Sequence, residues 1–418
     1  MRRSRTSSRS PARPQAALDY PLQDTVLDLP TNQVLALSAV KRKKYIRELI
    51  DGLVIEIDNG TMALKRRVPF KDEMRDLRAL VRTPADRYLR LDERSKRLYV
   101  LASRAPGYSH TYWSRHQMWK MTTKQGSLDA KLRKHDATLV GRLERLFDPN
   151  NAGKAAFRTS DSAILNALNH LQMNFSVGAA FPPFHAKLIA EKFLPTEGEC
   201  LVVDPCAGWG GRLLGTLCVN RTGVVRYVGI DPEKRNRDAY EGLTRRVTTW
   251  LKREIAGPRE SKIHYRPFED WIGTASAKML FGKADLVITS PPYFDAENYN
   301  TGNRKSSANR YTSYKKWREG FYRPLVKGAF DLLKPGGVFA LNIANVQGAN
   351  RLEDDARKLA RDAGFAPSGH FYKLAMSKMP GTTKNLRHET LVGGVRWKHE
   401  PVFVFQKPRV ETSDRNES

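Results

Sequence analysis

The chain has 418 residues, of which 72 are Lys or Arg and 44 are Asp or Glu, so its formal net charge is +28. This length predicts two or more domains, and a hydrophobic share of 40% is typical of a globular protein that folds without disulfides or metals. No apolar run is long enough to span a membrane.

The three cysteines, Cys200, Cys206 and Cys218, are odd in number and lack the spacing of metal ligands. They indicate reduced thiols in a cytoplasmic protein, bacterial or phage-encoded, and we expect no metal site. The excess of positive charge favours a polyanionic partner, with nucleic acid ahead of an anionic membrane.

The first segment, residues 1–20, is predicted to be a disordered basic arm, because residues 1–16 hold five Arg and no acid. Such an arm can contact phosphates. An organellar transit peptide has a similar composition, and an inert tail is an equally good interpretation. Residues 409–418 are predicted to form a disordered tail.

Residues 21–150 are predicted to be a separate N-terminal region that could bind DNA or recognise a target. Residues 35–54 have helical periodicity with one basic face. Residues 101–128 contain no acid and mix cations with aromatic residues, a composition that suits unpaired bases, although packing in a small core is the stronger interpretation. A loop rich in Asn, Gly and Ser at 147–162 is the predicted domain boundary.

From residue 160 to residue 408 the chain is predicted to form an α/β domain with a doubly wound, Rossmann-like sheet. Short apolar runs indicate buried strands, and helical stretches lie between most of them. The predicted strands are 201–204, 225–231, 262–265, 285–290, 337–343 and 401–406, and the predicted helices are 211–219, 233–253, 318–333 and 351–362. Ligands of such sheets bind beyond the carboxyl ends of the strands.

The first strand of this domain runs into a glycine-bearing turn, VVDPCAGWGGRLLG (202–215). Glycines allow a tight turn and a close approach of backbone to ligand. Asp231 ends the second strand, where an acid can accept hydrogen bonds from both hydroxyls of a ribose. A Rossmann dinucleotide site would place its glycines directly after the strand, whereas here Asp204 and Pro205 intervene.

The strongest signal is Ser290-Pro291-Pro292-Tyr293, which directly follows the predicted strand 285–290. An exocyclic amino nitrogen of cytosine or adenine is a poor nucleophile, because its lone pair is delocalised into the ring. Two acceptors, the Ser290 hydroxyl and the Pro291 carbonyl, could accept hydrogen bonds from its two N–H groups and so draw the lone pair out of that conjugation. The prolines keep the backbone extended, and Tyr293 offers a flat face to a flipped base.

Together these segments resemble the DNA amino-methyltransferase family of the N4-cytosine and N6-adenine type, over roughly residues 175–408. The resemblance implies S-adenosyl-L-methionine as the cofactor and the four residues Ser290 to Tyr293 as the catalytic motif. It also implies a set of cofactor contacts in three segments: Phe181, Phe184 and His185; Asp204, Pro205, Ala207, Gly208, Gly210 and Asp231; and a carboxylate after the third strand, Glu269 or Asp270.

DNA contacts are predicted in the acid-free stretch 298–318 that follows the motif and must border the pocket. Its candidates are Arg304, Lys305, Arg310, Tyr311, Lys315 and Lys316. Residues 373–388 are predicted to form a second basic loop on the same face. Two other functions remain alternatives: methylation of an amino group on an RNA base, and DNA binding by a methyltransferase fold without activity.

Overall fold

The computed structural model describes most of the chain. The described residues are 29–59, 70–92, 97–101, 106–113, 115–121, 126–151, 153–154, 158, 161–175, 180–294, 307–346, 349, 351–378, 389–392 and 395–409. The predicted basic arm lies outside them, as does the predicted tail beyond Arg409.

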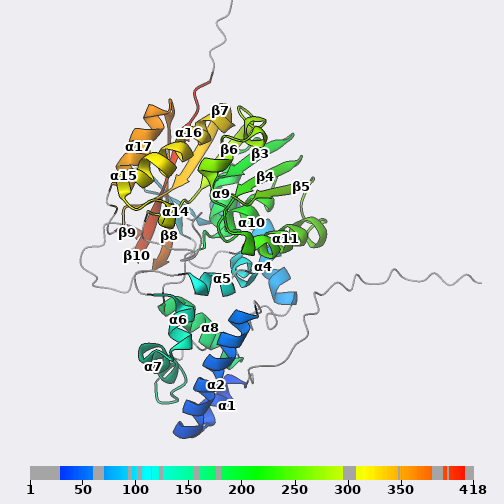
Figure 1. Ribbon diagram of the computed structural model, residues 1–418. Helices are drawn as coiled ribbons and strands as arrows, with labels where there is room; N and C mark the ends of the chain where they lie inside the picture. The colour runs from blue at the N-terminus through cyan, green and yellow to red at the C-terminus, as the bar shows by residue number, and fades with distance from the viewer. Residues whose placement is uncertain are drawn as a thin grey trace, which may run out of the picture.

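The described strands, ten in number, form one sheet at the centre of the molecule, in the order β1-β2-β8-β10-β7-β6-β3-β4-β5, with β9 paired to β10 (Figure 1). The strands are β1 Leu89–Asp92, β2 Arg97–Leu101, β3 Cys200–Asp204, β4 Val225–Ile230, β5 Arg259–His264, β6 Ala284–Thr289, β7 Leu333–Asn342, β8 Ala366–Lys378, β9 Glu389–Val392 and β10 Val395–Gln406. Strands β5, β4, β3, β6 and β7 are parallel, and β10 runs antiparallel between β7 and β8. The predicted doubly wound, Rossmann-like sheet is confirmed.

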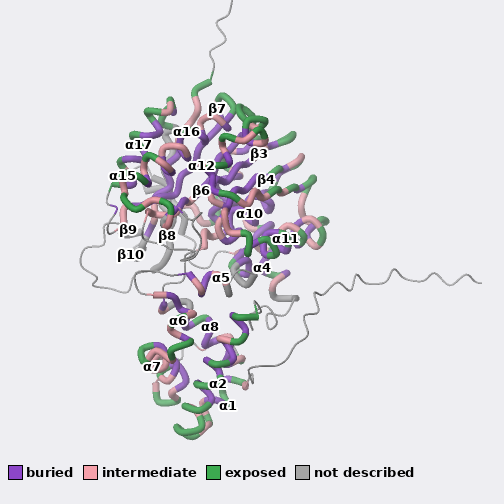
Figure 2. The backbone as a smooth tube through the Cα atoms, in the orientation of Figure 1, coloured by how far each residue is buried: buried purple, intermediate pink, exposed green. Residues whose placement is uncertain are grey.

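Both faces of the sheet are buried, as Figure 2 shows for its central strands. Successive strand residues point to opposite faces, so Val202 and Leu286 join one apolar cluster, whereas Val203 and Val287 join the other. The first face is covered by α4 Phe70–Arg82, α9 Pro183–Phe193, α10 Gly211–Leu217 and α11 Arg237–Arg245. The second is covered by α12 Phe268–Trp271, α13 Ala275–Lys278, α15 Tyr314–Trp317, α16 Arg323–Leu332 and α17 Leu352–Asp362.

Several N-terminal helices form a second body below the sheet (Figure 1). They are α1 Thr31–Ala36, α2 Ala39–Asp58, α5 Arg115–Lys120, α6 Leu128–Arg133, α7 Ala137–Leu146 and α8 Ala163–Asn174, and we call them the helical body. One apolar cluster holds them together. The predicted helix over 35–54 is divided in the structure, because Ser38 caps α2 by accepting a hydrogen bond from the Lys41 amide.

The two bodies do not divide the chain at the predicted boundary near residue 150. Helix α4 packs on the sheet, and β2 adds to it by parallel pairing with β8, so residues 70–92 and 97–101 belong structurally to the larger body. Helix α8, which begins after the predicted linker, belongs to the helical body. Apolar packing between distant segments, rather than chain order, therefore determines which segments belong to each body.

The prediction of a basic loop over 373–388 is wrong in its first part. Residues up to Lys378 continue strand β8, which is paired with β10 on one side and with β2 on the other. The sequence of this polar stretch alone predicted an exposed loop. Strand pairing instead satisfies the hydrogen bonds of its backbone. Residues 379–388 lie outside the described part of the chain.

Two buried arginines tie together the loops at the amino edge of the parallel strands. Arg259 donates to the carbonyl oxygens of Leu217, Val219 and Arg221 at 3.0–3.1 Å, and also to those of Gly223, Gly257 and Pro258. Arg221 donates to the carbonyl oxygens of Pro195, Glu197, Gly198 and Val224. No described helix is both long and apolar enough to cross a membrane.

Candidate active site at the carboxyl edge of the sheet

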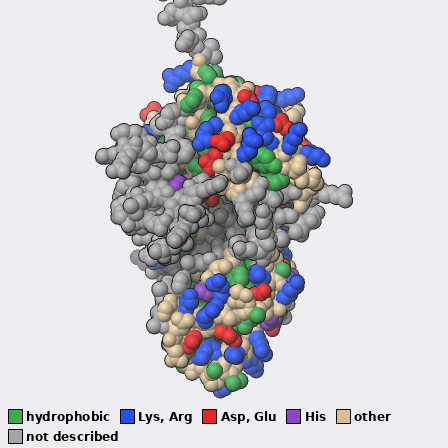
Figure 3. Space-filling model, turned by 90° about the vertical axis from the view of Figure 1, so that its left-hand side faces the viewer, with side chains coloured by type: hydrophobic (Ala, Val, Ile, Leu, Met, Phe, Trp, Pro, Cys, Tyr) green, Lys and Arg blue, Asp and Glu red, His purple; other side chains and the backbone are tan. Residues whose placement is uncertain are grey.

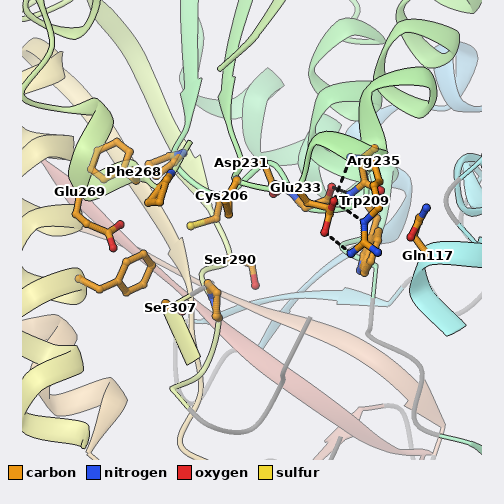
Figure 4. Close-up of a pocket in the computed structure, with 17 residues that line it drawn as sticks. Gln117, Cys206, Trp209, Asp231, Glu233, Arg235, Phe268, Glu269, Ser290 and Ser307 are labelled. Atoms are coloured by element: carbon orange, nitrogen blue, oxygen red, sulfur yellow. Dashed lines mark hydrogen bonds and ion pairs between the residues drawn. The ribbon is translucent and has the colours of Figure 1, made fainter. Parts of the chain in front are cut away.

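A pocket lies where the chain order of the sheet reverses. Strands β4 and β5 continue from β3 in one direction, whereas β6 and β7 lie on its other side, and a crevice opens between the loops that follow β3 and β6. The pocket holds about 840 Å³ of space, open to solvent, and residues from the ends of β3, β4, β5 and β6 line it (Figure 4).

The turn after β3 depends on its glycines. Gly208 and Gly210 have φ values of 59° and 84°, in the left-handed region that disfavours side chains. A Cβ atom on Gly211 would lie 1.9 Å from the carbonyl oxygen of Phe181, so only glycine lets α10 begin this close to the segment before α9. Gly208 lines the pocket. Its amide donates to Asp231, and its carbonyl oxygen accepts from the Tyr240 hydroxyl and the Asn236 side-chain amide.

Asp204, predicted to contact the cofactor, is instead fully buried and does not line the pocket. Its carboxylate accepts hydrogen bonds from Arg212 Nε and the Tyr227 hydroxyl, both at 2.7 Å, and from the Cys206 amide at 3.1 Å. With these three donors Asp204 holds the turn in shape. Arg212, which the sequence did not single out, neutralises its charge.

Asp231 does line the pocket, as predicted from its position at the end of β4. Its two oxygens each accept one backbone hydrogen bond of 2.8 Å, from Gly208 and from Glu233. Burial raises the pKa of the carboxyl to about 7, against the lowering effect of these two bonds, and the charges of Glu233 and Asp204 raise it further. An ionised carboxylate has about four acceptor positions, so two remain for hydroxyl groups of a ligand.

One end of the pocket forms an apolar slot with a carboxylate beside it. Phe268, Pro232 and Pro267 line the slot together with Glu269. Of the two predicted carboxylates, Glu269 is therefore the one that reaches the pocket, and burial raises its pKa. Asp270 is exposed and forms an ion pair with Arg310 at 2.8 Å. A flat heteroaromatic ring with an amino group suits such a slot.

Residue Arg310, predicted to bind DNA, thus has intramolecular partners. Its guanidinium contacts both Asp270 and Glu269, and the hydroxyl of Tyr311 donates to Glu269 at 3.1 Å. Both residues brace the slot in this structure. Lys315 and Lys316 are exposed on α15, and the other two DNA candidates, Arg304 and Lys305, lie outside the described residues.

The predicted catalytic motif leaves the carboxyl end of β6 and enters the same pocket. Ser290 and Pro292 line it, and Pro291 is buried. The half-buried Tyr293 donates its hydroxyl towards Glu400 Oε2 at 3.3 Å and the Asn342 carbonyl at 3.5 Å, so its ring is held against β7 and β10. The backbone turns sharply at the next residue, Phe294, where φ is 55°.

Of the remaining predicted cofactor contacts, only Pro205 lines the pocket, and the others do not. His185 is buried, its pKa is lowered to about 3 by burial, and neither ring nitrogen has a hydrogen-bond partner among the described residues. It packs edge-on against Phe181 at 6.4 Å. Ala207 and Gly210 are buried in the turn itself, Phe184 is buried in the core, and Pro205 lines the pocket.

Several lining residues were not predicted, among them Trp209 and Gln117. Trp209 stands within the glycine turn, and its indole packs into the apolar cluster of the helical body. Gln117 belongs to α5, far from the motifs in sequence, and nothing in its local sequence marks it as a pocket residue. Both residues bring the helical body to the pocket.

The pocket suits a cofactor that carries a nucleoside. Its apolar slot has a carboxylate acceptor, Asp231 keeps free acceptor positions, and the glycine turn permits close backbone approach. No cluster of three or more His, Cys, Asp or Glu side chains able to hold a metal ion occurs among the described residues.

No protein-family model and no curated protein sequence matches the chain. Solved structures resemble it weakly. A proposed RNA methyltransferase from Pyrococcus horikoshii is 14% identical, with 54% of this chain and 83% of that one covered at a TM-score of 0.32. A SAM-dependent methyltransferase from Methanosarcina mazei is 14% identical (53% and 97% covered, TM-score 0.30), and a SAM-dependent O-methyltransferase from Thermotoga maritima is 12% identical (57% and 71% covered, TM-score 0.31).

Proposed function

We propose that the protein is an S-adenosylmethionine-dependent methyltransferase that methylates an exocyclic amino group, cytosine N4 or adenine N6, of a base in DNA. One observation carries this proposal. The Ser290-Pro-Pro-Tyr segment leaves β6 and enters the same pocket as Asp231 and the glycine turn. A group that can activate an amino nitrogen therefore lies beside a site that suits a nucleoside cofactor.

Each residue of the motif would have its own role in the transfer. The Ser290 hydroxyl and the Pro291 carbonyl accept hydrogen bonds from the two N–H groups of the target amino group. These bonds restore nucleophilic character to its nitrogen. S-adenosylmethionine supplies the methyl group on a sulfonium, and the surplus proton passes to solvent after attack. The Tyr293 ring, fixed through Glu400, holds the flipped base in position.

Chemistry at a ring carbon is disfavoured by the state of the nearby thiol. Cys206 lines the pocket, but burial raises its pKa well above the usual range, so it stays a neutral thiol. Methylation of pyrimidine carbon 5 needs a thiolate nucleophile. An amino-group product is therefore the expected one.

A nucleic acid partner agrees with the charge of the chain. Figure 3 shows Lys and Arg side chains on both bodies, with Asp and Glu between them. Lys315 and Lys316 are exposed on α15, which follows the motif. Such cations contact phosphates without reading sequence, so they would position the strand rather than select a site.

The test is methyl transfer from labelled cofactor to DNA and to bulk RNA, followed by mass spectrometry of the nucleosides. Tyr293→Ala should lose most transfer yet still bind cofactor, because stacking on one base contributes about 1–3 kcal/mol and misplacement adds to the loss. Ser290→Ala should slow transfer less. Phe281→Ala is the matched control, because Phe281 is exposed in the segment that enters β6, at the opposite edge of the sheet.

Three outcomes would change the proposal. Methylated nucleosides found only in RNA would move the substrate to the RNA alternative. A 5-methylcytosine product would refute the role of Ser290. DNA binding without any transfer would support the inactive DNA-binding alternative.

A further inference from the structure

The end of the pocket opposite the apolar slot is polar, and part of it comes from the helical body. In Figure 4, Phe268 and Glu269 lie on one side of Asp231, whereas Glu233, Arg235, Trp209 and Gln117 lie on the other. The two ends thus differ in chemistry. One offers ring contacts, and the other offers charges and a carboxamide.

Gln117 is anchored in this place by the packing around it. Its neighbours in α5, Met118 and Trp119, are fully buried in the cluster of the helical body, and Trp209 from the glycine turn is buried in the same cluster. The turn and α5 are therefore held together by one apolar core. A side chain on α5 keeps a fixed position relative to the turn that lines the pocket.

The polar end has acceptor capacity that the described protein does not use. Gln117 Oε1 is buried and has no hydrogen-bond partner among the described residues, and the same is true of Oδ1 of Asn236, a lining residue that is only 3% exposed. A buried acceptor without a donor is costly, and such groups are often satisfied by a ligand.

The same end presents one positive and one negative side chain. Arg235 is bound by Glu233 through two hydrogen bonds of 2.6 and 2.8 Å, and both residues line the pocket. A guanidinium recognises a carboxylate, whereas a carboxylate with amide oxygens recognises an ammonium group. The set as a whole is complementary to an α-amino acid zwitterion.

We propose that this polar end, Gln117 with Glu233, Arg235 and Asn236, binds the amino-acid moiety of the cofactor, so that the helical body contributes a cofactor-binding residue. The inference rests on the proposed function. S-adenosylmethionine has its base at one end, its ribose in the middle and its amino acid at the other end. The pocket has the slot, Asp231 and the polar end in the same order.

The test compares two ligands by calorimetry. S-adenosylhomocysteine carries the amino acid, and 5′-methylthioadenosine lacks it. Gln117→Leu should weaken binding of S-adenosylhomocysteine about tenfold, the loss expected for one hydrogen bond to a charged group, and leave 5′-methylthioadenosine unchanged. Gln33→Leu, an exposed glutamine on α1, is the matched control and should change neither.

Arg235→Gln is a second variant that does not disturb a core, because the Arg235 side chain is 43% exposed, and it should show the same selectivity. Equal loss of both ligands in both variants, or no loss of either, would overturn the inference while the proposed function stands. A wild-type protein that binds neither ligand would refute the proposed function and this inference with it.

Discussion

Acid is expected to weaken cofactor binding, because Asp231 has to be ionised to accept both ribose hydroxyls. Burial raises the pKa of this carboxyl to about 7 in the free protein, and it is therefore mostly protonated at pH 5.5. A ligand that needs the carboxylate must displace the proton. The affinity then falls as the pH falls through the pKa of the free protein.

The size of the loss in affinity follows from the pKa of Asp231 alone. Well below pH 7 each pH unit costs a factor of ten in affinity, or about 1.4 kcal/mol, and above pH 8 the affinity should be constant. Between pH 8 and pH 5.5 the dissociation constant of S-adenosylhomocysteine should therefore rise about thirtyfold. Binding near pH 6 should release close to one proton.

Calorimetry in buffers of different ionisation enthalpy measures both quantities. Asp231→Asn should bind more weakly at pH 8 and should lose the pH dependence. The nearby carboxyls of Glu233 and Asp204 raise the pKa of Asp231 without taking its place, and Glu269 at the slot has a raised pKa of its own. Glu269→Gln is therefore the control that must keep the dependence.

Two results would refute this reasoning. The first is a wild-type dissociation constant that stays within twofold from pH 5.5 to pH 8. The second is a pH dependence that persists in Asp231→Asn and disappears in Glu269→Gln, which would place the titrating group at the slot instead.

Two further predictions concern stability, measured by thermal unfolding. Gly211→Ala should destabilise the protein by about 1–3 kcal/mol or more, because its Cβ would meet the Phe181 carbonyl at 1.9 Å. Gly141→Ala in α7 is the control and should not destabilise it, because there is open space around Gly141. Equal melting temperatures of the two variants would contradict the predicted clash. Arg259→Met should lower the free energy of unfolding by about 3 kcal/mol, because it leaves buried carbonyl oxygens unpaired. The affinity for S-adenosylhomocysteine should not change, since Arg259 lies at the opposite edge of the sheet from the pocket. Weaker binding would mean that the two edges are coupled.

Most of the parallel sheet could be predicted from sequence because its central strands are buried on both faces and consist of continuous apolar runs. Strand β6, Ala284–Thr289, is buried throughout and was located within one residue. Strand β8 was missed because polar and cationic residues interrupt it, and only its pairing with β2 and β10 makes it a strand. That pairing involves partners distant in sequence, which local patterns do not encode.

The candidate site, like the sheet, could be predicted from sequence only in part. Asp231 and Ser290 could be found because each ends a buried strand, where ligands of such sheets bind. The role of Asp204 could not be read, since its environment depends on the distant Tyr227 as well as on Arg212. Gln117 left no local signal at all, because its place in the pocket results from the packing of two bodies.

The pairing of β2 with β8 also constrains how the protein is made. Leu98 lies beside Tyr372, and β8 is held on its other side by β10, the last strand of the sheet. During synthesis this edge can therefore not close until β8 and β10 have left the ribosome. Meanwhile β2 presents unpaired backbone groups that can pair with another chain, so folding is expected to be slow and prone to aggregation until β8 is in place.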